Sequence, residues 1–209
     1  NYSKKKKEDL IQLILNNSKN DKINTENLNM TIIQNRGTGA GGANTNANGL
    51  PYEEMTDLSN CYNKIETNKH SSKIKFPNCV DEFITTKQSH LFKCMDTKMN
   101  KKIEKAHGCK NPDECFINEK KKCIYIIEKK FQQTSGSVCE KIQTPDFKIW
   151  QYERTFPGYN VVYIYSLSDW FKNNCKAELE YLTEKEVHVF FGNSESYKGD
   201  IINFIINYK

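Results

Sequence analysis

The segment HGCKNPDECFINEKKKCIYIIEKKF, residues 107–131, holds three of the eight cysteines of the chain and its most strand-prone run. Cys109, Cys115 and Cys123 fall within fifteen positions, and the run CIYIIEKKF, residues 123–131, begins at the third of them. β-Branched and aromatic residues dominate that run, which favours a strand. Cysteines this close together bind a metal, carry out redox chemistry or form structural disulfides, and the choice among these decides the fold and the compartment.

The spacing of the cysteines argues against a metal or redox site. No C-x-x-C pair occurs, whereas zinc sites take ligand pairs two to four residues apart and thioredoxin-type sites need the C-x-x-C turn. Of the four histidines only His107 lies near a cysteine, and its spacing matches no ligand pattern. An even number of cysteines at long intervals is typical of disulfides in an oxidising compartment, with buried reduced thiols as the alternative. We predict no metal and no cofactor, and a set of disulfides whose pairing stays open, formed by Cys61, Cys79, Cys94, Cys109, Cys115, Cys123, Cys139 and Cys175.

Charge and hydropathy exclude two kinds of partner. The net charge is +5, but only Arg36 and Arg154 among the 31 basic residues are arginines. Nucleic-acid recognition favours the arginine fork, so we expect no nucleic acid as a partner. No run approaches the 18 apolar residues of a membrane span, so we expect no transmembrane segment in this chain. The charged first residues, NYSKKKKEDL, indicate that any leader has already been removed.

Three regions are expected along the chain. Residues 1–35 form an N-terminal segment, with a short helix or strand at 8–16 and a strand at 30–34. Residues 36–51 are rich in Gly, Ala and Asn and predict a flexible loop or linker. Residues 52–209 form a cysteine-rich, β-rich domain that the N-terminal segment could complete. Glycosylation sequons, which accompany secretion, occur at Asn1, Asn16 and Asn29.

The pattern after residue 51 is dominated by short strands. Alternation around Pro157-Gly158 predicts a hairpin over 146–166, and either Ser168 or Asp169 is a suitable N-cap for a short helix at 168–174. A further helical turn or two is predicted at 99–106. Strands are predicted at 73–76, 81–86, 123–131, 146–156, 159–166, 186–192 and 200–208. The fold class expected is mainly β, a disulfide-stapled β-sandwich, with a β-rich α+β fold as the alternative.

No catalytic constellation stands out, so we predict a protein that is not an enzyme. The nucleophile elbow, the H-E-x-x-H motif and the kinase signature are all missing from the sequence. Glu178 and Glu180 are interpreted as a solvated pair, and His188, between two valines, as a half-buried structural histidine. Trp150 is interpreted as a core residue, with a sugar-stacking platform as the alternative.

The composition and cysteine content resemble those of surface proteins of malaria parasites. The chain has 24 asparagines and is rich in lysine, as are proteins of very AT-rich genomes such as those of Plasmodium. Together with the cysteines between residues 61 and 175, this composition resembles that of the six-cysteine β-sandwich family. It also resembles that of the cysteine-rich small secreted proteins of merozoites, whose fold is a degenerate version of the six-cysteine fold. The resemblance implies a secreted, non-enzymatic adhesion protein of the parasite surface. It also implies protein partners in an invasion complex, and a host receptor or glycan. The C-x-C pairs of that family are missing.

A carbohydrate-binding module is the alternative function. CKNPDEC, residues 109–115, resembles the cysteine-clamped loops of galactose-binding lectin-like domains. In that interpretation Asn111, Asp113 or Glu114 accepts hydrogen bonds from sugar hydroxyls, and Trp150 or Tyr152 stacks on the ring.

Overall fold

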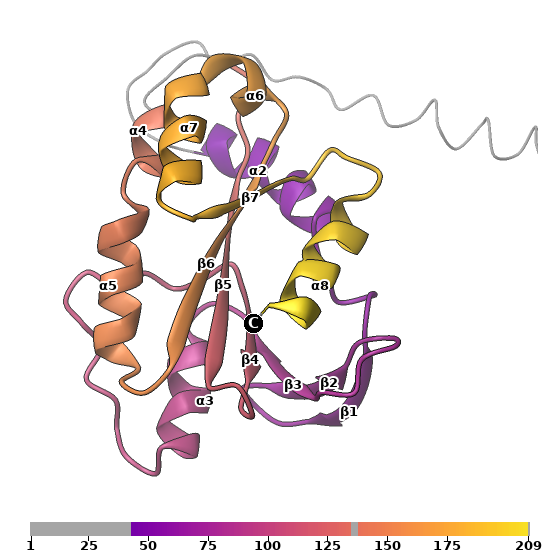
Figure 1. Cartoon of the computed structure of the whole chain (residues 1–209), viewed down its shortest axis with the longest axis vertical. Helices are drawn as coiled ribbons and strands as arrows, with labels where there is room; N and C mark the ends of the chain where they lie inside the picture. The colour runs from indigo at the N-terminus through magenta and orange to yellow at the C-terminus, as the bar shows by residue number, and fades with distance from the viewer. Residues whose placement is uncertain (1–42, 135–137, 209) are drawn as a thin grey trace, which may run out of the picture. The chain divides into compact units, whose positions relative to one another are not determined.

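The computed structural model describes residues 43–134 and 138–208. The chain divides into two units, 1–44 and 45–209, and the second contains the sheet. Within the described residues, one seven-stranded mixed sheet and seven helices form an α+β fold (Figure 1). The prediction of a mainly β sandwich is therefore wrong. The alternative α+β class is confirmed, although helices hold more residues than strands.

The strands are hydrogen-bonded in the order in which they occur in the chain. β1 to β5 pair antiparallel as a meander, whereas β5, β6 and β7 pair parallel. The free edges of the sheet are therefore β1 and β7. The strands are β1 (Asn63–Thr67), β2 (Ser72–Lys75), β3 (Phe83–Thr86), β4 (Glu114–Asn118), β5 (Cys123–Lys130), β6 (Asn160–Leu167) and β7 (His188–Phe191).

Helices connect the parallel strands because a two-residue turn cannot join parallel neighbours. α4 and α5 lie between β5 and β6, and α6 and α7 lie between β6 and β7. The helices are α2 (Ala43–Met55), α3 (His90–Lys98), α4 (Val138–Ile142), α5 (Pro145–Thr155), α6 (Trp170–Asn174), α7 (Lys176–Glu184) and α8 (Tyr197–Asn207).

The sheet separates two hydrophobic cores. Successive residues of a strand point to opposite faces, so Cys115 belongs to one core and Phe116 to the other. The first core, here called the α5-face core, takes Tyr152 from α5, together with side chains of α3, α4, α6 and α7. The second, the α8-face core, takes Ile201 and Ile205 from α8. In Figure 1, α5 and α8 lie on opposite sides of the central strands.

The hairpin predicted over residues 146–166 is wrong in its first half. Residues 145–155 form α5, with Pro145 in the first turn, where proline costs no hydrogen bond. Ile149, Tyr152 and Phe156 then face the α5-face core at helical spacing. The alternation that suggested a strand is overridden because the parallel pair β5–β6 needs a crossover.

The strand predicted at residues 200–208 is also wrong, because residues 200–207 belong to α8. Asp200 lies in its first turn, where a carboxylate is favourable, and Ile201 and Ile205 are buried four residues apart. An Ile-rich run fits a strand or a buried helix equally well. Here it forms a helix that packs on the face of the sheet opposite α5.

The helix expected at residues 99–106 is likewise wrong. The helix in this region is α3, which ends at Lys98, and Asn100 follows with φ 49°, a left-handed conformation common after helix ends. The segment 36–51, expected to be flexible, overlaps α2 from Ala43 onward, and residues 36–42 lie outside the described residues. The elements expected at 8–16 and 30–34 and the three sequons lie outside them as well.

The remaining expected elements are confirmed. They are the strands at 73–76, 81–86, 123–131, 159–166 and 186–192, which correspond to β2, β3, β5, β6 and β7, and the short helix at 168–174, which corresponds to α6. Asp169 precedes α6 at the N-cap position, but its side chain makes no capping hydrogen bond.

Candidate functional site

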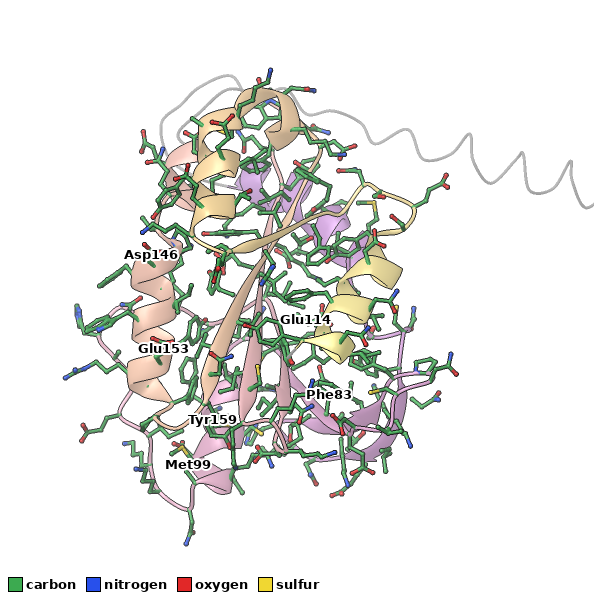
Figure 2. All side chains as sticks on the ribbon, viewed as in Figure 1. Phe83, Met99, Glu114, Asp146, Glu153 and Tyr159 are labelled. Carbon is green, nitrogen blue, oxygen red and sulfur yellow. A yellow bond between two sulfur atoms is a disulfide. The ribbon has the colours of Figure 1, made fainter. Side chains whose placement is uncertain are left out.

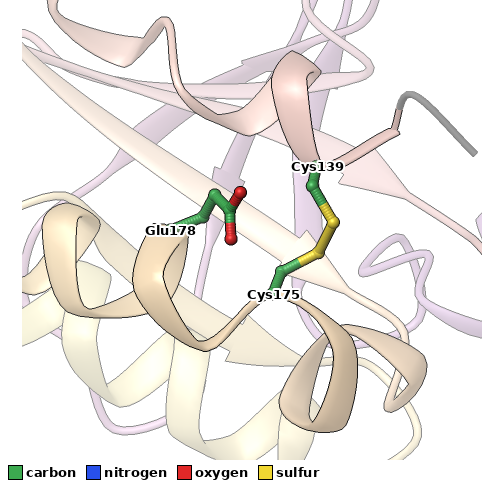
Figure 3. A group of neighbouring side chains, drawn as sticks. All are labelled: Cys139, Cys175 and Glu178. Carbon is green, nitrogen blue, oxygen red and sulfur yellow. A yellow bond between two sulfur atoms is a disulfide. The ribbon is translucent and has the colours of Figure 1, made fainter.

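One disulfide joins the helices on the α5 face of the sheet. Cys139 in α4 and Cys175 between α6 and α7 are bonded, with Cα atoms 5.9 Å apart (Figure 3). Glu178 lies beside them, and its carboxylate oxygen and the two sulfurs fall within 4.8 Å of one another. Both sulfurs are used in the bridge, whereas metal binding needs thiolates, so this group acts as a staple. Glu178 accepts a hydrogen bond from Gln143 Nε2 at 3.0 Å.

The other six cysteines are free thiols, divided equally between the two faces of the sheet. Those on the α5 face are Cys94, Cys109 and Cys115, and those on the α8 face are Cys61, Cys79 and Cys123. A disulfide needs Cβ atoms about 3.8 Å apart, so no bridge can pass through the sheet. Three thiols per face allow at most one further bridge on each. The prediction that all eight cysteines pair is therefore wrong in this fold.

The free thiols are poorly suited to nucleophilic chemistry. Burial raises the pKa of Cys115 well above its usual value, and the neighbouring Cys94 raises it further. Burial also raises the pKa of Cys61, Cys94, Cys109 and Cys123. Because the thiolate is the reactive form, these side chains act as small apolar core residues.

The four residues considered for sugar binding do not converge on an open site. Tyr152 is buried, and its hydroxyl donates to the carbonyl of Lys110 at 2.8 Å. The Asp113 carboxylate accepts the backbone N–H of Lys129 at 2.7 Å. Asn111 Oδ1 accepts a hydrogen bond from a lysine at 3.0 Å. Only Trp150 presents its ring to solvent.

Glu114, also considered for sugar binding and labelled in Figure 2, is buried. Its side chain is 0% exposed and pairs at 3.2 Å with Lys129, which is 4% exposed. Burial raises the pKa of Glu114, and the cationic Lys129 opposes that rise. A carboxylate held in this way is not accessible to a ligand.

The outer face of α5 carries the most prominent exposed aromatic group of the described residues. Phe147 and Trp150 are 59% and 49% exposed. Their rings are stacked, with centroids 5.6 Å apart and planes 18° apart. The Arg154 guanidinium lies 5.6 Å from the Trp150 ring. These residues, at i, i+3 and i+7, share one helix face, and we call them the α5 surface.

The flank and the buried side of α5 are fixed to the body of the protein. Gln151 Nε2 donates to the carbonyl of His107 at 2.7 Å, and Tyr152 donates to Lys110 as described above. At the start of the helix, Asp146 pairs with Lys185 at 3.0 Å and accepts a hydrogen bond from Tyr181 at 3.3 Å. Figure 2 labels Asp146 and Glu153 near the two ends of the helix. The α5 surface is therefore held on a rigid element, and little entropy is lost when it binds.

A charged cluster lies beneath α5, on the same face of the sheet. Lys148 is 17% exposed, and its Nζ lies 3.3 Å from the Tyr165 hydroxyl and 3.8 Å from Glu128. Burial lowers the pKa of Lys148. Glu128 also pairs with Lys130 at 2.5 Å. Burial and the charge of Glu128 raise the pKa of Asp113 to about 6. Lys130 and Lys148 compensate Glu128, whereas Asp113 accepts a backbone N–H but has no ion-pair partner within the described residues.

A cavity of about 660 Å³ lies along the β7 edge of the sheet. Its lining includes Glu186 and His188, together with apolar residues of α7 and β7. The ring of His188 packs 4.1 Å from that of Phe204, and burial lowers its pKa. No hydrogen bond joins His188 to Glu186 within the described part of the chain.

The fold and these sites define an α+β protein with one mixed sheet between helices and an exposed aromatic helix face. No protein-family model, no curated protein and no solved structure matches the chain. Among the described residues, no helix combines the length and apolar character that crossing a membrane requires.

The sequence interpretation missed the α5 surface because residues 146–156 were assigned to a strand. In that assignment Phe147 and Trp150 lie on opposite faces, with Trp150 directed to the core. The spacing of Phe147, Trp150 and Arg154 at i, i+3 and i+7 was the available signal.

Proposed function

We propose that this protein is a non-enzymatic adhesion or complex-forming module that binds a protein partner through the α5 surface. The observation that carries the proposal is the stacked, exposed pair Phe147–Trp150 with Arg154 over the indole. Folding does not require two large rings in water, and contiguous exposed apolar groups mark interaction sites. Trp and Arg are also the residues most enriched among the energetically dominant contacts of interfaces.

The setting proposed is outside the cell, on or near the surface of a malaria parasite, in a complex used for host-cell invasion. The Cys139–Cys175 bridge supports an oxidising compartment. The lysine- and asparagine-rich composition supports the parasite origin. The free thiols are compatible with this setting because five of the six are buried and out of reach of oxidants.

The test is affinity capture from merozoite extracts with the immobilised chain, in its wild-type form and as the Phe147→Ala/Trp150→Ala variant. We expect a partner retained by the wild type and lost from the variant. The matched control is Ile65→Ala/Val80→Ala, which removes two other exposed apolar side chains far along the sequence. Equal capture of the partner by all three forms would show that the α5 surface is not the binding site.

A glycan ligand is the second candidate, favoured by the exposed indole of Trp150. Sugars stack on exposed tryptophans, and a glycan array separates the two functions. Binding to one class of glycan that disappears in Trp150→Ala would favour the lectin-like function. If no glycan on the array binds and a protein is captured, the adhesion module is favoured.

A further inference from the structure

We propose that the segment of the partner that contacts the α5 surface is an acidic polypeptide with aromatic or large apolar side chains. This inference rests on the proposed function and adds the chemistry of the partner. It comes from the loop formed by residues 101–110, here called the basic loop, which lies against the flank of α5.

The second half of the basic loop, from Ala106 to Lys110, is fixed to α5. The backbone N–H of Ala106 donates to Thr155 Oγ1 at 3.1 Å, and the carbonyls of His107 and Lys110 accept the bonds from Gln151 and Tyr152. Gln151 follows Trp150 directly and lies one helical turn before Thr155. Gln151 and Thr155 lie on the flank of α5 between the α5 surface and the buried side of the helix, so residues 106–110 of the loop run along the edge of that surface.

The basic loop carries an excess of positive charge that the protein itself does not neutralise. Its cations, all exposed, are Lys101, Lys102, Lys105 and Lys110. Within the described ranges, neither these lysines nor Arg154 has a carboxylate at ion-pair distance. The nearby acids are Glu104 in the loop, Glu153 on α5 and Asp96 on α3, whose carboxylate accepts the backbone N–H of Ile103 at 2.6 Å, so five cations face three carboxylates. An excess of this kind attracts an acidic partner and sets its orientation.

The combination of aromatic centre and cationic margin fits a polypeptide better than a polyanionic polymer. Interfaces concentrate binding energy in central aromatic and arginine side chains, with charged residues at the rim. Phe147, Trp150 and Arg154 provide such a centre, and the basic loop provides the rim. A sulfated glycan or a nucleic acid would use the cations mainly. With one arginine at this surface, the geometry for phosphate is poor.

The experiment uses a displayed library of random dodecamer peptides selected on the full chain in its wild-type form. Enriched peptides are then measured against three variants by the dissociation constant. Lys101→Glu/Lys102→Glu/Lys110→Glu reverses the rim, and Phe147→Ala/Trp150→Ala removes the centre. The control Lys64→Glu/Lys69→Glu/Lys75→Glu makes the same change in net charge at other exposed lysines that form no ion pair within the described residues.

We expect enriched peptides to contain Asp or Glu together with an aromatic residue. Binding should be at least tenfold weaker for the rim variant, weaker again for the centre variant, and unchanged for the control. Loss of several exposed ion pairs, with added repulsion, accounts for a change of that size. Raising the salt from about 50 to about 300 mM should weaken wild-type binding several-fold.

Two outcomes would overturn the inference. The first is a selection whose peptides are not enriched in Asp or Glu, or whose peptides bind the rim variant with the same dissociation constant as the wild type. The second is retention on heparin that depends on the rim lysines but not on the aromatic pair, which would indicate a glycan. If protein capture still requires Phe147 and Trp150 while rim reversal has no effect, the proposed function stands and the acidic partner does not. If neither variant changes capture, both fail.

Discussion

Replacement of Asp113 by asparagine should stabilise the protein at neutral pH and not in acid. Burial and the neighbouring Glu128 raise the pKa of Asp113 from 3.8 to about 6. The folded state therefore binds its proton more tightly than the unfolded state does, and this contribution to stability is lost as the pH rises from about 4 to 6. Two pKa units correspond to about 3 kcal/mol at most, because one unit is worth about 1.36 kcal/mol. The amide introduced by Asp113→Asn cannot ionise, and its oxygen can still accept the N–H of Lys129.

Urea unfolding, followed by tryptophan fluorescence at about pH 4.0 and pH 7.5, measures this effect. The free energy of unfolding of Asp113→Asn should exceed that of the wild type by about 1–3 kcal/mol at the higher pH, and the difference should approach zero at the lower pH. Glu153→Gln, at an exposed site on α5, is the control and should show neither effect. A variant that is less stable than the wild type at neutral pH, or a difference independent of pH, would refute the reasoning.

Three further predictions concern the scaffold. Removing the Cys139–Cys175 bridge with serines should lower the free energy of unfolding by about 4 kcal/mol, because the bridge closes a loop with a sequence separation of 36; equal denaturation midpoints would contradict this. Glu114→Ala should cost about 3–5 kcal/mol by leaving Lys129 buried without its partner, and adding Lys129→Met should recover much of that loss in urea unfolding. Trp150→Ala should change stability by less than about 1 kcal/mol because the ring is half exposed, and a larger drop in thermal melting would show a structural role.

The sequence predicted the central strands well, because their residues satisfy local and tertiary preferences together. The runs at 123–131 and 159–166 are β-branched and aromatic, and both form buried strands of the sheet. The connections were predicted poorly. Whether two such strands pair parallel or antiparallel is a property of the whole sheet, and the parallel pairing of β5 with β6 forces residues 145–155 into a helix.

The candidate site failed for a related reason. A large aromatic such as Trp150 is expected in the core, whereas the helical spacing of α5 places it in solvent beside Phe147. In the carbohydrate-binding alternative Trp150 or Tyr152 stacks on a sugar ring, but α5 buries Tyr152. The even cysteine count indicated complete pairing, and sequence alone cannot show that a sheet divides the thiols between two faces.

A count and map of free thiols tests the central claim, the arrangement of one sheet between two separate cores, most directly. The native protein is denatured without reduction, alkylated, digested and analysed by mass spectrometry. The fold predicts a bridge between Cys139 and Cys175 and at least two alkylated cysteines, one from Cys94, Cys109 and Cys115 and one from Cys61, Cys79 and Cys123. Eight oxidised cysteines, or any bridge that joins one of these groups to the other, would contradict the fold and the surfaces derived from it.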